Sequence, residues 1–493
     1  MEANKTFFKS DIGKAISSGY FLFFLNNVVA LFLTPYILRF VSKQEYGLYV
    51  LCSDFLSWMI FLEFGSSKVM ESKGAHLLAT DDKSGLLRAF NSALFFQFFM
   101  AILIVPIFYF LVITGLKNYD IPNFRLIIII FSLTAGLSVI RSIFSAILIA
   151  SRKIHIDNKI QVLINVLNYA LILLLIPYIG IKGLATISLL VAALILLRSY
   201  KRVFFLFPYL HINFKDFKKE ELKAILSQGI YFSVASIATM LITKFDSFFL
   251  GKNFGLATVA KFYISIKLIA VAEKLFMNLV NNLRPYIANF YGQKKIDQIY
   301  NFYNLAVPLL LALSLIVFSI LMIINEWFVK FWVGVDFFIG NKFVVLFGIY
   351  TILNIITLPA RIVLTSTFYK LKSNAALRIC EGVLRLSIIL LFMKSTQTIL
   401  LPLSSVISSF LLGFLAQHLL LKSFFTSYTI PIQNKYPYFL LIILLLVLAD
   451  QFVSGLKYTP MILLFSGVLL TVHFYLFDRK KMFAFVHLLK VAN

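Results

Sequence analysis

The stretch "LITKFDSFFLGKNFG" (residues 241–255) places a lysine and an aspartate inside a run that is otherwise largely apolar. Lys244 and Asp246 lie two residues apart, so on a helix their side chains point roughly 200° away from each other. No residue three or four positions from either one carries a charge, so neither has an ionic partner on its own helix. The stretch therefore predicts a membrane-spanning helix that presents its two charges to two different neighbours.

The rest of the chain has the same membrane character. Hydrophobic residues make up 60% of the 493 residues and charged residues only 14%, which lies far outside the range of soluble globular chains. Apolar windows of about 20 residues recur, each long enough to cross a bilayer, and about fourteen spans result. They lie near 16–38, 47–64, 89–114, 125–150, 160–179, 182–204, 224–250, 256–280, 303–325, 343–369, 374–393, 397–421, 437–455 and 459–477. The predicted fold class is an all-α polytopic membrane protein with about 14 transmembrane helices.

The formal net charge of +25 does not indicate a nucleic-acid partner, because the Lys and Arg residues lie mostly in the segments between the predicted spans, on one side of the membrane. If the N-terminus is cytoplasmic, the inner segments hold a roughly threefold excess of Lys and Arg over the outer loops. This bias predicts that both termini face the cytoplasm. It also predicts that lysines beside the spans contact anionic membrane lipids.

The chain repeats itself at a nearly constant offset. "ISSGYFLFFLNN" (16–27) and "LSQGIYFSVASI" (226–237) each place Ser-x-Gly before an aromatic-rich span, and "RSIFSAILIASRK" (141–153) corresponds to "RIVLTSTFYKLK" (361–372). We therefore predict two parallel-related six-helix lobes plus two extra C-terminal helices. The predicted parts are an N-terminal lobe (1–205, spans 1–6), a cytoplasmic inter-lobe connector (206–223), a C-terminal lobe (224–425, spans 7–12) and two additional spans (436–478, spans 13–14).

The repeat gives Arg141 and Arg361 corresponding positions, each roughly 15 Å from the cytoplasmic end of its span. A charge at a helix centre costs roughly 2.5–3.5 kcal/mol on insertion scales, so such residues face a wet cavity or a partner. Two guanidinium groups near the midplane can hold one phosphate-bearing ligand, with Lys244 and Lys267 as further cations. The alternative is that each arginine pairs with an acid in a neighbouring span.

Acids and one further arginine complete the predicted site. Asp54 and Asp246 are available as partners for the arginines, and Arg385 can pair with Glu381 four residues earlier on its own helix. The candidate substrate-binding residues are Arg141, Arg361, Lys244, Lys267, Asp246, Asp54 and Arg385. The six histidines show no HExxH spacing and no GxxxxGK[ST] motif occurs, so we expect no metal and no cofactor.

Two segments carry a resemblance to a known family. "TPYILRFVSKQEYGLY" (34–49) bridges the first two spans, and "KFDSFFLGKNFGLATVAKFY" (244–263) bridges the seventh and eighth. The first holds a Gly-aromatic pattern at Tyr46, Gly47, Leu48 and Tyr49, and the second holds Asp246 before a short outer loop bounded by Gly251 and Gly255. Over residues 10–425 the chain thus resembles the polysaccharide transporter family of the multidrug/oligosaccharidyl-lipid/polysaccharide exporter superfamily.

The resemblance implies a flippase for a polyisoprenyl-diphosphate-linked oligosaccharide repeat unit, such as an O-antigen unit. Such a protein works by alternating access in the bacterial cytoplasmic (inner) membrane, for the synthesis of lipopolysaccharide, capsule or exopolysaccharide. It is not an enzyme, and its expected partners are that lipid-linked glycan, membrane lipids, and a glycan polymerase or glycosyltransferases of the same pathway. We expect a monomer.

Two other functions stay open. A cation-coupled multidrug or toxic-compound exporter of the same superfamily would favour acids over bases within the spans. A membrane glycosyltransferase or glycan polymerase would need a larger outer domain than any loop of this chain provides.

Overall fold

The structure of the chain is a computed structural model in which every regular element of the described residues is helical. The described residues are 11–58, 62–115, 121–151, 153–243, 245–281, 283–367, 369–392, 398–428, 447, 450 and 456–477. The predicted fold class, an all-α polytopic membrane protein, is confirmed. The chain forms two compact units, Met1–Ala260 and Lys261–Asn493.

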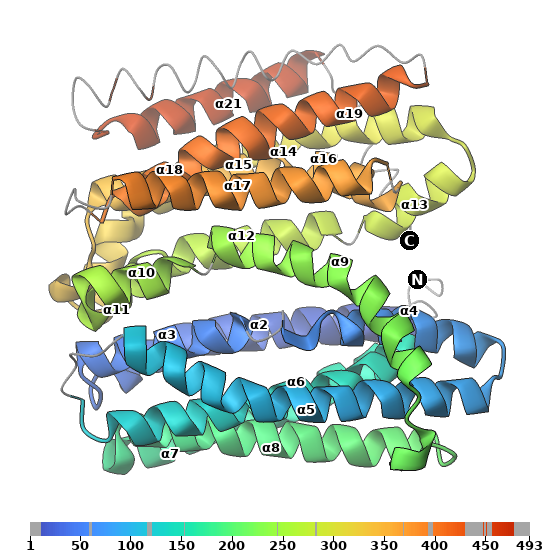
Figure 1. Cartoon of the computed structure of the whole chain (residues 1–493). Helices are drawn as coiled ribbons and strands as arrows, with labels where there is room; N and C mark the ends of the chain where they lie inside the picture. The colour runs from blue at the N-terminus through green and yellow to red at the C-terminus, as the bar shows by residue number, and fades with distance from the viewer. Residues whose placement is uncertain are drawn as a thin grey trace, which may run out of the picture. The chain divides into compact units, whose positions relative to one another are not determined.

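The first unit contains the helices that end before Ala260 (Figure 1). They are α2 (Asp11–Ile37), α3 (Lys43–Trp58), α4 (Ser66–Ala79), α5 (Lys83–Gly115), α6 (Phe124–Ala150), α7 (Ile154–Ile179), α8 (Ile181–Leu206), the 3-10 turn η2 (Phe214–Asp216), α9 (Lys219–Thr243) and α10 (Phe245–Phe254). Helix α6 packs against α5 and α8, α7 packs against α2 and α8, and α10 packs against α3 and α9. Phe90 and Phe144 lie in the hydrophobic core among α4, α5, α6 and α8.

The second unit holds the remaining helices, and α11 (Leu256–Ser265) crosses the boundary between the units. They are α12 (Lys267–Asn281), α13 (Arg284–Gly292), α14 (Ile296–Val333), η3 (Val335–Phe337), α15 (Asn341–Ile356), α16 (Leu358–Ser366), α17 (Leu371–Leu391), α18 (Leu400–Ser408), the π-helical segment η4 (Ser409–Ala416), α19 (Gln417–Thr426) and α21 (Thr459–Phe477). Helix α14 packs against α15 and α21, and α17 packs against α18 and η4.

The predicted spans coincide with helices almost throughout. Each one matches a single helix or two or three consecutive helices, except 437–455, which lies outside the described residues apart from Val447 and Asp450. Among the described residues, seven helices are long and apolar enough to cross a membrane. They are Lys83–Gly115, Phe124–Ala150, His155–Ile179, Ile181–Leu206, Ile296–Val333, Asn341–Ser366 and Leu400–Thr426.

The segment after α8, predicted as the connector, is held against α5 by two fully buried polar residues. Asn91 donates to the His211 carbonyl (3.0 Å) and accepts from the Asn213 N–H (3.0 Å). Ser92 accepts from the Lys218 N–H (2.9 Å). Both side chains therefore satisfy backbone groups of an irregular segment, which would otherwise lack hydrogen-bond partners.

Asp82 caps the start of α5, outside the membrane-spanning part of the chain. Its carboxylate accepts from the Gly85 N–H (2.8 Å) and from the Ser84 hydroxyl (2.9 Å). These two hydrogen bonds favour the ionised form and hold the pKa of Asp82 below its usual range. The negative charge also suits the positive end of the helix dipole.

Helices α4 and α9 meet at two glycines. A Cβ atom on Gly65 would lie 2.3 Å from the Gly229 carbonyl oxygen, and one on Gly229 would lie 2.0 Å from the Phe64 carbonyl oxygen. Gly65 also has a φ of +64°, which favours glycine. In the repeated Ser-x-Gly pattern, Gly229 is thus required by a close backbone contact, whereas a Cβ on Gly19 would only reach ordinary contact with Asn158.

Two helix breaks in the second unit have local causes. Pro359 stands in the first turn of α16, where its missing N–H costs nothing, and the helix therefore restarts after Thr357. At the end of α11, the Ser265 carbonyl accepts from the Asn325 side chain (2.9 Å). The Ser265 hydroxyl accepts from the Ile339 N–H (3.0 Å). Hydropathy alone predicts one continuous span in each place.

Candidate functional site

Arg141 on α6 forms an ion pair with Asp157 in the first turn of α7. Its Nη2 atom lies 3.0 Å and 3.1 Å from the two carboxylate oxygens of Asp157. Ser145 (3.0 Å) and Gln161 (2.9 Å) donate to the same carboxylate. The Asp157 side chain is 5% exposed and that of Arg141 is 23% exposed. The carboxylate is therefore fully satisfied, while part of the Arg141 side chain stays accessible.

A row of amides continues from this ion pair along α2 and α7. Asn158 donates to Ser18 (3.1 Å), and both Asn165 (2.9 Å) and Tyr169 (2.8 Å) donate to the side-chain oxygen of Asn26. Polar side chains on membrane helices bond across the interface because lipid offers them no partner. This row fixes the register of α2 on α7.

We expect Asp157→Ala to reduce the amount of folded protein strongly. Removing one partner of a buried ion pair costs roughly 3–5 kcal/mol, and the partly exposed Arg141 puts this site near the lower end. Asp297→Ala is the matched control, because that side chain is exposed. Size-exclusion chromatography of detergent-extracted protein after stepwise heating measures the effect. Equal heat resistance of the two variants would contradict the structural role of the pair.

Arg361 on α16 has a different environment from Arg141. Its Nη2 atom donates to the side-chain oxygen of Asn354 (2.7 Å) and to the hydroxyl of Thr357. Asn354 in turn donates to Glu273 on α12 (2.5 Å). Within the part of the chain that the structure describes, Arg361 forms no ion pair, since both of its acceptors are neutral. Its positive charge is therefore held in place without being neutralised by direct contact.

A second charged group in the same unit involves α17 and the π-helical segment. Glu381 accepts from Arg378 (2.6 Å) and from Ser409 (2.8 Å). A Cβ on Gly413 would lie 3.0 Å from the Glu381 carboxylate, so the π-helical segment passes close to this acid. Arg385 is fully buried and is the largest such side chain among the described residues. The predicted Glu381–Arg385 pair stays a prediction.

The other predicted site residues lie in different places. Asp54 on α3 and Asp246 on α10 are buried in the first unit, at 4% and 6% exposure. Lys267, the first residue of α12, lies 5.9 Å from the ring centroid of Tyr263. Lys244 lies outside the described residues.

Sequence reasoning missed the partners that hold both arginines. Asp157 lies three residues before the predicted span 160–179 and therefore outside it, whereas α7 already begins at Ile154. Asn354 and Thr357 are neutral, so a search for buried charge passes over them. The i, i+4 spacing of Thr357 and Arg361 and the i, i+7 spacing of Asn354 and Arg361 are the signal that could have found them.

Neither a protein-family model nor a curated protein sequence matches the chain. Among solved structures, it is similar to a multidrug resistance MATE family transporter of the MOP superfamily. The TM-score is 0.64 at 16% identity, over 82% of this chain and 94% of that one. The chain has the fold of a MATE transporter. It is an all-helical, multi-pass membrane protein, as expected from sequence.

Two further solved structures have the same fold. A MATE transporter from Vibrio cholerae matches with a TM-score of 0.53 at 14% identity, over 86% of this chain and 98% of that one. A MOP superfamily transporter from Pyrococcus furiosus matches with a TM-score of 0.56 at 14% identity, over 83% of this chain and 93% of that one. The latter is described as having a binding pocket of reverse polarity that suggests a different function. One fold thus accommodates pockets of different polarity, and the substrate must be argued from this chain's own residues.

Proposed function

We propose that the chain is an alternating-access membrane transporter for an anionic, lipid-linked saccharide. The substrate we propose is an oligosaccharide repeat unit on a polyisoprenyl diphosphate, moved across the bacterial cytoplasmic membrane for cell-surface polysaccharide synthesis. The fold shared with solved transporters supports transport as the class of function. Membership of the polysaccharide transporter family is part of this proposal.

The environment of Arg361 is the observation that supports an anionic substrate. An arginine within a membrane-spanning segment is expected to have a carboxylate partner, because an isolated charge there is costly. Arg361 instead donates to Asn354 and Thr357, two neutral acceptors in the described part of the chain. A guanidinium group with a remaining positive charge and a fixed orientation suits a phosphate, to which the N–H groups that Asn354 and Thr357 do not bind can donate.

The other predicted residues have supporting roles in this proposal. Arg141, Lys244 and Lys267 supply further positive charge, and the accessible part of Arg141 lies beside its pair with Asp157. Asp54, Asp246 and Arg385 complete the set of buried charges that we assign to substrate binding. The expectation that Arg141 and Arg361 bind the same diphosphate is also part of the proposal.

The physical task explains why positive charge is needed and catalytic groups are not. The saccharide head is too polar to cross about 30 Å of hydrocarbon, whereas the polyisoprenyl tail prefers lipid. A wet cationic site near the midplane lowers the barrier for the head, and rigid-body rocking of two repeats exposes that site to each side in turn. No covalent bond has to form or break, so we propose a transporter and not an enzyme.

A cation exporter is the second candidate. Two of the similar structures are described as MATE transporters, and one of these as a multidrug resistance transporter. In this chain, buried Asp54 and Asp246 would be the acids that bind a cation or a coupling proton. This candidate predicts that neutralising the acids abolishes transport and that neutralising Arg361 does not.

One experiment separates the two candidates. Purified protein is reconstituted into liposomes that contain a polyisoprenyl diphosphate carrying a fluorescent saccharide, and a membrane-impermeant quencher reports its movement between leaflets. Uptake of the cationic dye ethidium is followed in the same preparation under a proton gradient. We expect saccharide movement above that of empty liposomes and no dye uptake. Dye uptake without saccharide movement would refute the proposed substrate and favour the cation exporter.

We also propose that both termini and the segment 206–223 face the cytoplasm, on the basis of the charge distribution. A cysteine introduced by Lys218→Cys in a Cys380→Ser background should react with a membrane-impermeant maleimide only after permeabilisation. Lys252→Cys, in the predicted outer loop, should react in intact cells. Both lysines are exposed, and the remaining Cys52 is buried. Labelling of the residue at 218 in intact cells would reverse the proposed orientation.

A further inference from the structure

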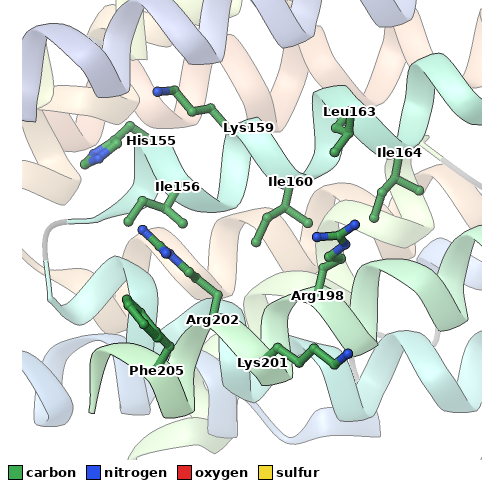
Figure 2. A pocket seen from close by; sticks show the side chains of 10 residues that line it. All are labelled: His155, Ile156, Lys159, Ile160, Leu163, Ile164, Arg198, Lys201, Arg202 and Phe205. Carbon is green, nitrogen blue, oxygen red and sulfur yellow. The ribbon is translucent and has the colours of Figure 1, made fainter. Parts of the chain in front are cut away.

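A cavity of about 540 Å³ lies between α7 and α8 in the first unit. Its size falls within the range of small-molecule sites, roughly 300–1,000 Å³. The lining residues come from the start of α7 and the end of α8: His155, Ile156, Lys159, Ile160, Leu163, Ile164, Arg198, Lys201, Arg202 and Phe205. Figure 2 shows the side chains of Arg198 and Arg202 reaching from α8 toward α7.

The cavity is strongly basic and lacks acids. Four lining residues, Lys159, Arg198, Lys201 and Arg202, carry full positive charges, and no lining residue is acidic. Helix α8 contains no Asp or Glu, and the acid on α7, Asp157, is already bound by Arg141, Ser145 and Gln161. Among the described residues, none of the four cations forms an ion pair.

This clustering has an energetic cost that a ligand would relieve. Arg198 and Arg202 are four residues apart on α8, and like charges at that spacing destabilise a helix. The orientation of the chain in the membrane requires positive charge near the helix ends, but it does not require two guanidinium groups directed at one cavity. An anion in the cavity would offset the repulsion and could accept paired hydrogen bonds.

The apolar part of the lining faces the same cavity. Ile156, Ile160 and Ile164 recur at four-residue spacing on α7, and Leu163 and Phe205 are 61% and 72% exposed. The remaining surface of α7 also presents exposed apolar side chains, such as Leu167 and Leu174, as expected for a helix in contact with lipid. A ligand here would therefore meet cations at one end and apolar side chains along its length.

We infer that this cavity binds the phosphate of an anionic lipid, with Arg198 and Arg202 on the phosphate and the lipid chain along the apolar face of α7. Basic pockets between membrane helices suit such head groups. Two sources share this chemistry, an anionic phospholipid of the bilayer and a polyisoprenyl phosphate carrier. The site does not rest on the proposed transport function, since none of its lining residues belongs to the set assigned to substrate binding.

Native mass spectrometry of the purified full chain tests the site by titration with separate probes. The probes are dioleoylphosphatidylglycerol, undecaprenyl phosphate, dioleoylphosphatidylcholine and glycerol 1-phosphate. We expect at least one of the two anionic lipids to bind, phosphatidylcholine to bind more weakly, and tail-less glycerol phosphate not to compete. The anionic lipid that binds identifies the source of the phosphate.

Variants assign the binding to the cavity. Arg198→Gln/Arg202→Gln should weaken anionic-lipid binding by about tenfold or more, because at least one charge-assisted contact is lost. Lys215→Gln/Lys218→Gln removes the same charge from exposed positions outside the cavity and should bind as wild type. Arg198→Lys/Arg202→Lys, which keeps both charges, should bind with intermediate affinity. If the glutamine pair fails to fold, the lysine pair is compared with the wild type in its place.

Three results would overturn the inference. They are wild-type affinity in the Arg198→Gln/Arg202→Gln variant or, if that variant does not fold, in the lysine pair; an equal loss in the Lys215→Gln/Lys218→Gln control; and full competition by glycerol 1-phosphate, which would remove the lipid chain from the site. None of these results bears on the outcome of the transport assay, so the lipid site and the proposed transport function can be refuted separately.

Discussion

Replacing Arg361 with alanine is expected to abolish movement of the lipid-linked saccharide while the protein stays in the membrane. The guanidinium donates only to the neutral groups of Asn354 and Thr357, so its removal leaves no buried carboxylate without a partner in direct contact. Loss of two charge-assisted hydrogen bonds to phosphate, each worth roughly 1.5–3 kcal/mol, corresponds to a drop in transport of about a hundredfold or more.

Two conservative changes at the same position sharpen this prediction. Arg361→Lys keeps the charge but not the planar fork and should retain part of the activity. Arg361→Gln keeps polar N–H donors but has no charge, and it should be inactive if Arg361 binds an anion. Arg39→Ala, at an exposed position, is the control for loss of an arginine. The amount of each variant in the membrane is measured by quantitative immunoblotting, in parallel with its transport activity.

The opposite pattern would indicate a purely structural role. If Arg361 only fixes the break between α15 and α16, Arg361→Ala should reduce the amount of protein and Arg361→Gln should transport normally. Full transport by a well-expressed Arg361→Ala variant would remove Arg361 from the site altogether.

The second large effect is expected at Gly47, and it concerns folding. A Cβ atom there would lie 1.9 Å from the Leu256 carbonyl oxygen and 2.6 Å from the carbonyl carbon. These are backbone atoms next to Gly255, which has a φ of +91°, so no side-chain rotation can make room. Overpacking typically costs about 1–3 kcal/mol and more where the backbone must move. We expect Gly47→Ala to leave little extractable, monodisperse protein.

Gly292→Ala is the matched control, because a Cβ at that position would meet no atom within 4 Å. Fluorescence-detected size-exclusion chromatography of both variants, expressed from the same vector, gives the comparison. A Gly47→Ala protein with the same yield and melting temperature as Gly292→Ala would show that the close approach between Gly47 and Leu256 is not required.

The spans were predictable because membrane insertion depends on a local property. Twenty apolar residues in a row satisfy it without knowledge of any neighbour, and the helices therefore fall where hydropathy places them. The breaks at Thr357 and Ser265 and the π-helical segment at Ser409–Ala416 were not predictable in this way. The break at Ser265 depends on a side chain distant in sequence, because Asn325 donates to the Ser265 carbonyl. The break at Thr357 is associated with Pro359, which a hydropathy window does not register.

For the site residues, too, the sequence predicts positions but not the partners that depend on the fold. The repeat predicts corresponding positions for Arg141 and Arg361, but it does not predict the difference between their partners. Arg141 meets Asp157 because α7 begins earlier than its apolar run, whereas Arg361 meets neutral residues of α15 and the adjoining turn. The resemblance singled out Gly47 through its Gly-aromatic pattern, but only the contact with Leu256 explains why glycine is needed there.

A cross-linking measurement tests the central claim most directly. A polyisoprenyl diphosphate saccharide with a photoreactive diazirine beside the diphosphate is incubated with the reconstituted wild-type protein, irradiated and mapped by peptide mass spectrometry. We predict cross-links on the segment that contains Asn354, Thr357 and Arg361, competed by unlabelled lipid-linked saccharide and lost in Arg361→Gln. Cross-links that avoid α15 and α16, or that persist unchanged in Arg361→Gln, would contradict the account.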